Sequence, residues 1–242
     1  MHKTKQKSLK TVDNDNEYHA CTFYLSKDVE YKIENCIFDN CSFRNDVTFS
    51  AIVNCHFHQC SFSNQFQLNL RDANAMNLHR ELPRLSLLTH LDLRLNSLDH
   101  FPVEICQLSR LVKLNLQHNK IHTLPTEISQ LSSLRYLDLG HNLLLTLPDE
   151  IRQLKCLQKL YLCDNYLQNI PPAVSELTSL THLDLETNDL KSIPREIANL
   201  QSLEYLNLAE NKIRLYDRRR LRKWLPKKCR INYKSSYMSP WE

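Results

Sequence analysis

The chain has 242 residues, with 31 lysines and arginines against 27 aspartates and glutamates, and a net charge of +4. This length builds one solenoid or at most two small domains, and so small a charge does not by itself indicate a polyanionic partner. The 42% of hydrophobic residues and 24% of charged residues are typical of a soluble protein. No apolar run approaches the ~20 residues of a membrane span, and residues 1–19 lack the apolar centre of a signal peptide, so we expect a cytoplasmic protein.

The first 66 residues divide into a flexible tail over residues 1–20 and a β-rich N-terminal cap over residues 21–66. Within the cap, CIFDNCSF from Cys36 to Phe43 and CHFHQCSF from Cys55 to Phe62 repeat a cysteine-x-phenylalanine unit five residues apart. This spacing resembles that of pentapeptide-repeat proteins. The resemblance implies a short right-handed β-helix, and a pair of β-hairpins is the competing interpretation.

The N-terminal cap also contains the side chains that usually bind zinc. These are Cys36, Cys41, Cys55, His56, His58 and Cys60. A phenylalanine follows each cysteine at a fixed spacing, which indicates stacked core positions instead. The total of nine cysteines is odd, so we expect reduced thiols and no disulfide framework, no metal and no cofactor.

A 23-residue period follows, close to L-x-x-L-x-L-x-x-N-x-L-x-x-L-P-x-x-I-x-x-L-x-x. Six copies begin at Leu88, Leu111, Leu134, Leu157, Leu180 and Leu203. The pattern is identified as a leucine-rich repeat of the intracellular 23-residue type with Leu-Pro, and it covers more than half of the chain. The resemblance implies an α/β solenoid over residues 67–215, a horseshoe with a parallel β-sheet on its concave side.

Each fixed position of the period has a physical reason. Leu91 and Leu93 alternate as in a strand, so stacked repeats align them in buried columns. The amide of Asn96 can bond backbone groups that the turn leaves unpaired inside the stack. Pro102 sets the backbone before a short helical return whose Ile105 faces inward. A degenerate repeat precedes the first clear one and has in register Leu68, Leu70, Ala75, Leu78, Leu82 and Leu85.

The pattern changes in YDRRRLRKWLPKKCRINY, residues 216–233. A basic amphipathic helix carrying Leu221 and Trp224 is followed by Cys229, Ile231 and Tyr233 in strand alternation, and residues 234–242 are a tail. We interpret residues 216–233 as a C-terminal cap that covers the last repeat and its strand edge. The alternative is that its arginines and lysines contact phosphates or an anionic membrane surface.

Residues that flank the buried leucines should project from the concave face. Their charge changes along the stack, from basic side chains such as Arg94 and Lys113 to acidic ones such as Asp184 and Glu186. The predicted partner-binding residues are His90, Asp92, Arg94, Lys113, Asn115, His118, Tyr136, Asp138, His141, Leu143, Lys159, Tyr161, Cys163, Asp164, Tyr166, His182, Asp184 and Glu186.

The middle of this face combines aromatic and small residues. Tyr136, Tyr161 and Tyr166 are expected to surround Gly140 and Cys163, which resembles the centre of a protein interface. The alternative for Gly140, the only glycine, is that a strand turn merely tolerates it.

A catalytic use of this face is not expected. Cys163 could meet His141 and His182 from neighbouring strands as a thiolate-imidazole pair, but no enclosing pocket or oxyanion site is evident. The protein is therefore not expected to be an enzyme.

The resemblance implies a recognition module similar to leucine-rich repeat effectors of intracellular pathogenic bacteria. We expect the concave face to dock a folded protein, one to one, and to regulate or inhibit it, with the free protein a monomer. Nucleic acid on this face is disfavoured by its acidic half, and a peptide ligand stays open. The alternatives are an adaptor for a host GTPase or ubiquitin-pathway protein, membrane or nucleic-acid contact through the basic cap, and secretion into the host cytosol without a signal peptide.

Overall fold

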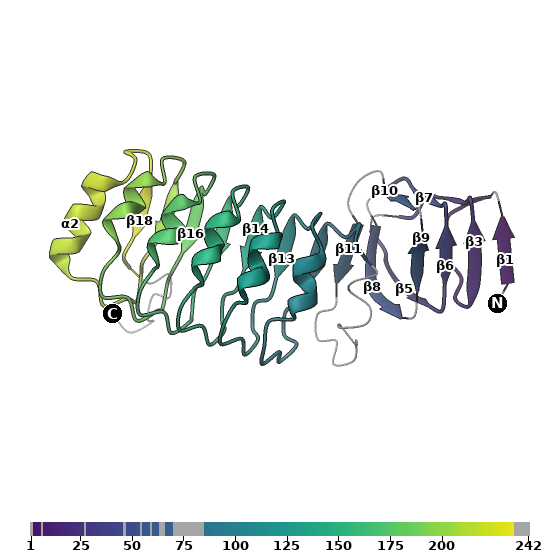
Figure 1. Cartoon of the computed structure of the whole chain (residues 1–242), viewed down its shortest axis with the longest axis horizontal. Helices are drawn as coiled ribbons and strands as arrows, with labels where there is room; N and C mark the ends of the chain where they lie inside the picture. Colours follow the sequence, from purple (N-terminus) through teal and green to yellow (C-terminus); the bar gives the residue numbers. More distant parts are fainter. Residues whose placement is uncertain are drawn as a thin grey trace.

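The computed structural model describes residues 2–5, 7–26, 28–45, 47–53, 55–58, 60–62, 66–69 and 85–234. These form one elongated stack, with the N-terminus at one end and helix α2 at the other (Figure 1). Every strand pair in the described residues is parallel, and the strands form two four-stranded sheets and one ten-stranded sheet. Parallel pairing of successive strands means that the chain winds in coils.

The two short sheets belong to the N-terminal coils. One contains β1 (His2–Lys5), β3 (Asn16–His19), β6 (Ile37–Asp39) and β9 (His56–His58). The other contains β2 (Ser8–Leu9), β4 (Thr22–Phe23), β7 (Ser42–Phe43) and β10 (Ser61–Phe62). A hairpin needs antiparallel strands, so the hairpin interpretation is wrong and the region is a parallel β-solenoid.

Aromatic rings fill the N-terminal coils. Phe23 and Phe43 stack at 4.8 Å between ring centroids, as do Phe38 and Phe57. The buried Cys41 follows Asn40, whose φ of 53° turns the chain at a corner. A small residue fits inside such a corner, which explains the cysteine-x-phenylalanine spacing.

The residues considered as possible zinc ligands occupy different corners of these coils. The backbone N–H of Cys36 lies 3.4 Å from Cys55 Sγ, whereas Cys41 and Cys60 interact at another corner. Among the residues that the structure describes, no group of three or more histidine, cysteine, aspartate or glutamate side chains could hold a metal. The side chains of His56 and His58 lie outside that part. All nine cysteines lie within it, and none of them forms a disulfide.

The expected flexible tail over residues 1–20 needs correction. Strands β1 and β2 pair in parallel with β3 and β4, so the solenoid already includes the first residues that the structure describes. Tyr18 is buried and stacks on Phe38 at 5.2 Å, and Lys3 forms an ion pair of 3.2 Å with Glu17. The backbone of a polar strand can complete a ladder without an apolar pattern of its own, which is why the pattern does not reveal it.

The ten-stranded sheet continues from these coils through the leucine-rich repeats without a break. Its strands are β5 (Glu30–Glu34), β8 (Val47–Val53), β11 (Phe66–Asn69), β12 (His90–Asp92), β13 (Lys113–Asn115), β14 (Tyr136–Asp138), β15 (Lys159–Tyr161), β16 (His182–Asp184), β17 (Tyr205–Asn207) and β18 (Arg230–Asn232). Leu68 pairs in register with both Phe49 and Leu91, as expected for the strand of the degenerate repeat. The remaining predicted positions from Leu70 to Leu82 lie outside the described residues.

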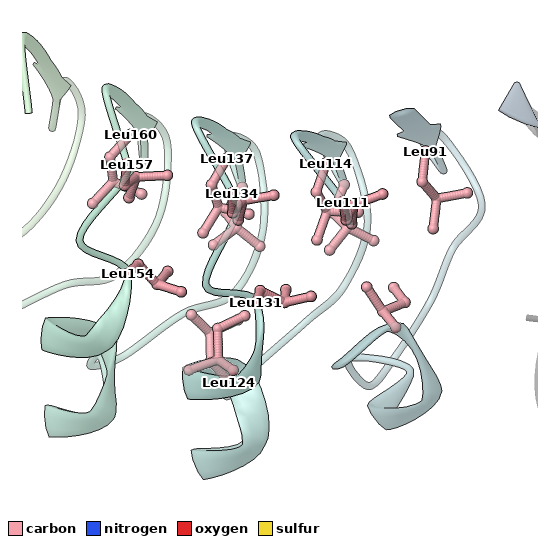
Figure 2. Close-up of a cluster of buried hydrophobic side chains, with 14 of the residues drawn as sticks. Leu91, Leu111, Leu114, Leu124, Leu131, Leu134, Leu137, Leu154, Leu157 and Leu160 are labelled. Carbon is pink, nitrogen blue, oxygen red and sulfur yellow. The ribbon is translucent and has the colours of Figure 1, made fainter. Parts of the chain in front are cut away.

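Leucines of successive repeats form the core of the horseshoe. Leu114, Leu137 and Leu160 are fully buried and point from neighbouring strands toward the return segments (Figure 2). Each return is a five-residue 3-10 helix that starts directly after a proline, as the Leu-Pro step predicts. These helices are η2 (Val103–Gln107), η3 (Thr126–Gln130), η4 (Asp149–Gln153), η5 (Pro172–Glu176) and η6 (Arg195–Asn199).

The asparagine column has the structural role expected of it. The Asn165 side chain donates to the carbonyls of Leu139 at 3.0 Å and Leu162 at 3.1 Å. Its Oδ1 accepts the N–H of Leu144 at 2.9 Å. The same amide also donates to the Cys163 carbonyl at 3.2 Å, so it bonds four backbone groups from two repeats. Equivalent bonds are made by Asn119, Asn142, Asn188 and Asn211.

The C-terminal cap is the predicted helix and strand. Helix α2 (Leu215–Trp224) buries Leu221, and Leu225 is buried just after it. Strand β18 then pairs with β17 and forms one edge of the ten-stranded sheet. Within the described residues, no helix has the length and apolarity needed to cross a bilayer.

Candidate binding surface

The side chains that alternate with the buried leucines lie on the side of the ten-stranded sheet that faces away from the leucine core. We call this surface, between β12 and β17, the sheet face. Its columns have the register that the period predicts. The third repeat position aligns His90, Lys113, Tyr136, Lys159, His182 and Tyr205, and the fifth aligns Asp92, Asn115, Asp138, Tyr161, Asp184 and Asn207. Side chains 23 residues apart in sequence are therefore direct neighbours in space.

The fifth column has a structural role that the sequence interpretation missed. Asp138 Oδ1 accepts the N–H of Gly140 at 3.0 Å, and Asp184 Oδ1 accepts the N–H of Glu186 at 3.0 Å. The same bond, to the backbone two residues on, is made by Asp92, Asn115 and Asn207. These side chains therefore stabilise the ends of their strands in the free protein, whether or not a partner is bound. Five of the six positions are aspartate or asparagine, two residues whose side chains commonly bond the backbone of turns. This composition was the signal in the sequence that could have revealed the structural role.

A pair of tyrosines occupies the middle of the sheet face. The rings of Tyr136 and Tyr161 lie 5.3 Å apart, and the Tyr136 hydroxyl donates to Asp138 Oδ2 at 3.1 Å. Lys113 Nζ lies 4.8 Å above the Tyr136 ring. Burial raises the pKa of both phenols, so each keeps its proton at neutral pH. Tyr166 is 52% exposed at the rim, and in the described residues it forms no ring contact with this pair.

Gly140 and Cys163 are neighbours beside the tyrosine pair. A Cβ on Gly140 would lie only 2.8 Å from Cys163 Sγ and 3.3 Å from Asp138 Oδ1. The backbone of Gly140 does not have a positive φ. Close packing, and not the backbone angle of a turn, therefore requires the absence of a side chain at this position.

Three residues after the end of each of these strands, the chain turns in the left-handed region. At the eighth repeat position φ is between 50° and 61° in Leu95, His118, His141, Asp164, Thr187 and Glu210. The rings of His118 and His141 stack at 4.1 Å, and His141 Nδ1 lies 2.6 Å from Asp164 Oδ2. The turn thus lines up ionisable side chains along one side of the sheet face.

The charge gradient along the sheet face is weaker than the sequence suggests. Arg94 bonds Asp92 through two nitrogens, the closer at 2.6 Å from Asp92 Oδ2, which neutralises a positive charge in the first repeat. In the fifth, Asp189 pairs with Lys212 at 2.6 Å. Burial, followed by the charges of Glu186 and Asp138, raises the pKa of Asp184.

The thiol of Cys163 is not activated. Burial raises its pKa to about 12, and the nearby Asp184 and Asp138 act in the same direction. A nucleophilic cysteine needs the opposite, a lowered pKa next to a cation. The arrangement therefore favours a packed thiol over a catalytic one.

The same outer surface extends beyond the repeats. Thr48 in β8 pairs with Gln67 in β11, which pairs with His90 in β12, so the third column continues toward the N-terminus. The 23-residue spacing still separates Gln67 from His90 but not Thr48 from Gln67, which is why the sequence interpretation missed the extension to β8.

Comparisons with known proteins agree with this architecture. Residues 122–218 match the model of a leucine-rich repeat region, and residues 110–131 match that of a single leucine-rich repeat. No curated protein matches the chain.

Three solved structures illustrate the likeness. The first is a leucine-rich repeat protein of Leptospira interrogans, with 24% identity and a TM-score of 0.55, covering 90% of this chain and 64% of that one. The second is the leucine-rich repeat ectodomain of the membrane receptor kinase GASSHO1/SCHENGEN3 of Arabidopsis thaliana in complex with Casparian strip integrity factor 2, with 24% identity, a TM-score of 0.54 and coverage of 74% and 25%. The third is an internalin of Listeria monocytogenes, with 15% identity, a TM-score of 0.52 and coverage of 85% and 74%.

The chain spans less than two thirds of the length of the first two of these proteins. At such identities the likeness concerns the fold. The matching models identify residues 110–218 as leucine-rich repeats, and the fold of the chain is structurally similar to that of bacterial leucine-rich repeat proteins.

Proposed function

We propose that this chain is a protein-binding module that docks a folded partner on the sheet face, one to one, and regulates or inhibits it as a bacterial effector. The observation that carries the proposal is the Tyr136–Tyr161 pair at the middle of the face. Tyrosine contributes large contact area at low entropic cost and is enriched at interface centres. The effector role rests on the resemblance of the repeats to those of effectors from intracellular pathogens.

The size of the sheet face fits a protein partner. Six repeats with five outward positions offer about 30 residues, against the ~20 to 30 that one side of a standard interface uses. Asp138 and Lys113 hold Tyr136 in place before binding, so little side-chain entropy is lost on association. Leucine-rich repeat proteins are typically non-catalytic scaffolds, which supports binding as the activity.

The test combines partner capture with alanine variants. We expect Tyr136→Ala and Tyr161→Ala each to weaken binding of the captured and purified partner by about 1 to 4 kcal/mol, measured by calorimetric titration. The control is Tyr24→Ala, because Tyr24 is 49% exposed and lies on the N-terminal coils away from the sheet face. Unchanged affinity in the double variant would exclude the tyrosine pair as the centre of the interface.

An activity assay of the captured partner separates regulation from adaptor function. An inhibitor lowers the partner's activity in proportion to the complex formed, whereas an adaptor for a GTPase or a ubiquitin-pathway protein leaves it unchanged. The same alanine variants then show whether the change in activity depends on the sheet face.

A further inference from the structure

A pocket lies at the C-terminal end of the stack, away from the tyrosine pair. Its volume is about 600 Å³, and it is formed by one side of α2 and by the last strand with the residues after it. Its lining residues are Arg218, Arg219, Arg222, Ile231, Asn232, Tyr233 and Lys234. It therefore combines four cationic side chains with an isoleucine and a tyrosine.

Two of the arginines are held in place by the cap. Arg218 Nε donates to the Ile213 carbonyl at 3.2 Å, and its guanidinium lies 4.9 Å above the Tyr233 ring. Arg222 Nη1 donates to the Cys229 carbonyl at 3.2 Å. A guanidinium has five N–H donors, so each group keeps further donors for an anion. Such fixed arginines bind carboxylates with little loss of side-chain entropy.

The pocket also borders an open strand edge. Among the residues that the structure describes, strand β18 pairs only with β17, through bonds from Arg230 N–H to the Glu204 carbonyl and from Leu208 N–H to the Asn232 carbonyl, both at 2.8 Å. In a parallel ladder alternate residues face opposite sides, so Ile231 directs its N–H and C=O away from β17. An exposed edge of this kind is a template for one more strand.

We propose that this pocket binds an acidic peptide segment, which extends the sheet beside β18 and places its carboxylates on Arg218, Arg219 and Arg222. The peptide backbone pairs with Ile231. Alternate side chains of an added strand face opposite sides of the sheet, so acidic ones on the side of α2 reach Arg218 and Arg222 beside Ile231 and Tyr233. The side chains between them face the side of Asn232 and Lys234. This is a second interaction surface, separate from the sheet face.

The surroundings favour a peptide over a long polyanion. A nucleic acid or a lipid surface needs a wide cationic area, and the acidic side chains on the adjacent repeats confine that area to the cap. Glu204 pairs with Lys228 at 3.2 Å, and Glu186 and Glu210 lie on the last repeats of the sheet face. A short segment that enters the pocket avoids these charges.

The test uses the full chain and a fluorescein-labelled peptide of alternating glutamate and valine, with binding measured by fluorescence anisotropy. We expect saturable binding that weakens as salt increases. A peptide of alternating lysine and valine should not bind. The glutamate-valine peptide N-methylated at alternate residues should lose at least about tenfold in affinity, because it cannot pair with a strand edge.

Charge-reversal variants locate the site. Arg219→Glu with Lys234→Glu should weaken binding at least about tenfold, since both side chains are exposed and line the pocket. The matched control is Lys223→Glu with Lys227→Glu, two exposed cations of the same cap that do not line the pocket, and it should change affinity by less than about threefold. Tyr136→Ala should leave peptide binding unchanged. Circular dichroism confirms that each variant is folded.

Three results would overturn the proposal. Equal loss in the matched control would indicate general charge attraction, and full binding of the N-methylated peptide would exclude strand pairing. Tighter binding of single-stranded RNA or of phosphatidylserine vesicles, lost in the Arg219 and Lys234 variant, would assign the pocket to a polyanion instead.

Discussion

At the scale of single residues, the packing of Gly140 against Cys163 accounts for the small size of both side chains. The glycine leaves space that the neighbouring sulfur fills, beside the carboxylate that ends strand β14. Both residues can be recognised as small from the sequence, but their contact depends on the lateral spacing of two strands. A packing requirement of this kind becomes visible only with coordinates.

A substitution pair tests this packing. Gly140→Ala should destabilise the protein, because overpacking costs about 1 to 3 kcal/mol and exceeds the roughly 0.4 to 1 kcal/mol gained from a less flexible unfolded chain. Adding Cys163→Ala removes the sulfur and should restore at least half of the loss, measured by urea denaturation. Cys163→Ala alone is the control. If the double variant loses as much as the two single variants combined, the sulfur is not what excludes the methyl group.

Strand ends are organised by the fifth repeat position at the scale of elements. Its aspartates and asparagines each accept a backbone N–H two residues on, so part of the polar surface predicted for binding belongs to the scaffold. Burial of such a carboxyl is unfavourable when it is ionised, and at Asp184 burial raises the pKa. Ionisation of Asp184 therefore destabilises the folded state relative to the unfolded one.

The pH dependence of stability follows from the sign of this shift. The penalty is absent below the unfolded pKa and appears as pH rises through the higher folded pKa. Asp184→Asn keeps the oxygen that accepts Glu186 N–H but cannot ionise, so its stability relative to the parent should increase from about pH 3 to about pH 7. Asp184→Ala should lose about 1 kcal/mol even at acidic pH, because the N–H loses its acceptor. A pH-independent difference for Asp184→Asn in chemical denaturation would contradict the assignment.

At the scale of the whole molecule, the described residues form one continuous stack in which each coil contacts its neighbours. Stability in such a stack is the sum of intrinsic coil terms and nearest-neighbour terms, so damage at one end is felt most there. Helix α2 covers the last repeat with the buried Leu221. The cap thus protects the strands nearest to it.

A core substitution in the cap tests this property. Leu221→Ala should lower the free energy of unfolding by about 2 to 5 kcal/mol, and hydrogen exchange should accelerate in β16 and β17 more than in β12 and β13. Tyr216→Ala is the control, since this side chain is 65% exposed on the same helix. Uniform loss of protection across all strands would show instead that the stack opens as a single unit.

The predictability of this architecture follows its periodicity. A 23-residue spacing places the core leucines and the buried asparagine column of the repeats, so the horseshoe and its columns follow from the sequence. The first coil does not, because His2 pairs with Asn16 through backbone groups while its side chains have no repeated pattern. The cap pocket could not be foreseen either, since it depends on how α2 packs against β18. Buried positions that recur at a fixed spacing can be predicted from the sequence, whereas a single contact between a helix and a strand cannot.

The left-handed turns after the six strands show where the molecule holds backbone strain. Glycine would enter this backbone region freely, whereas any other residue there costs about 1 kcal/mol, and none of the six positions has glycine. This row of six turn positions along the horseshoe therefore carries backbone strain that substitution by glycine would remove. The imidazoles, carboxylates and leucine at these positions therefore reduce the stability of the fold. Selection for stability alone would favour glycine at each of them.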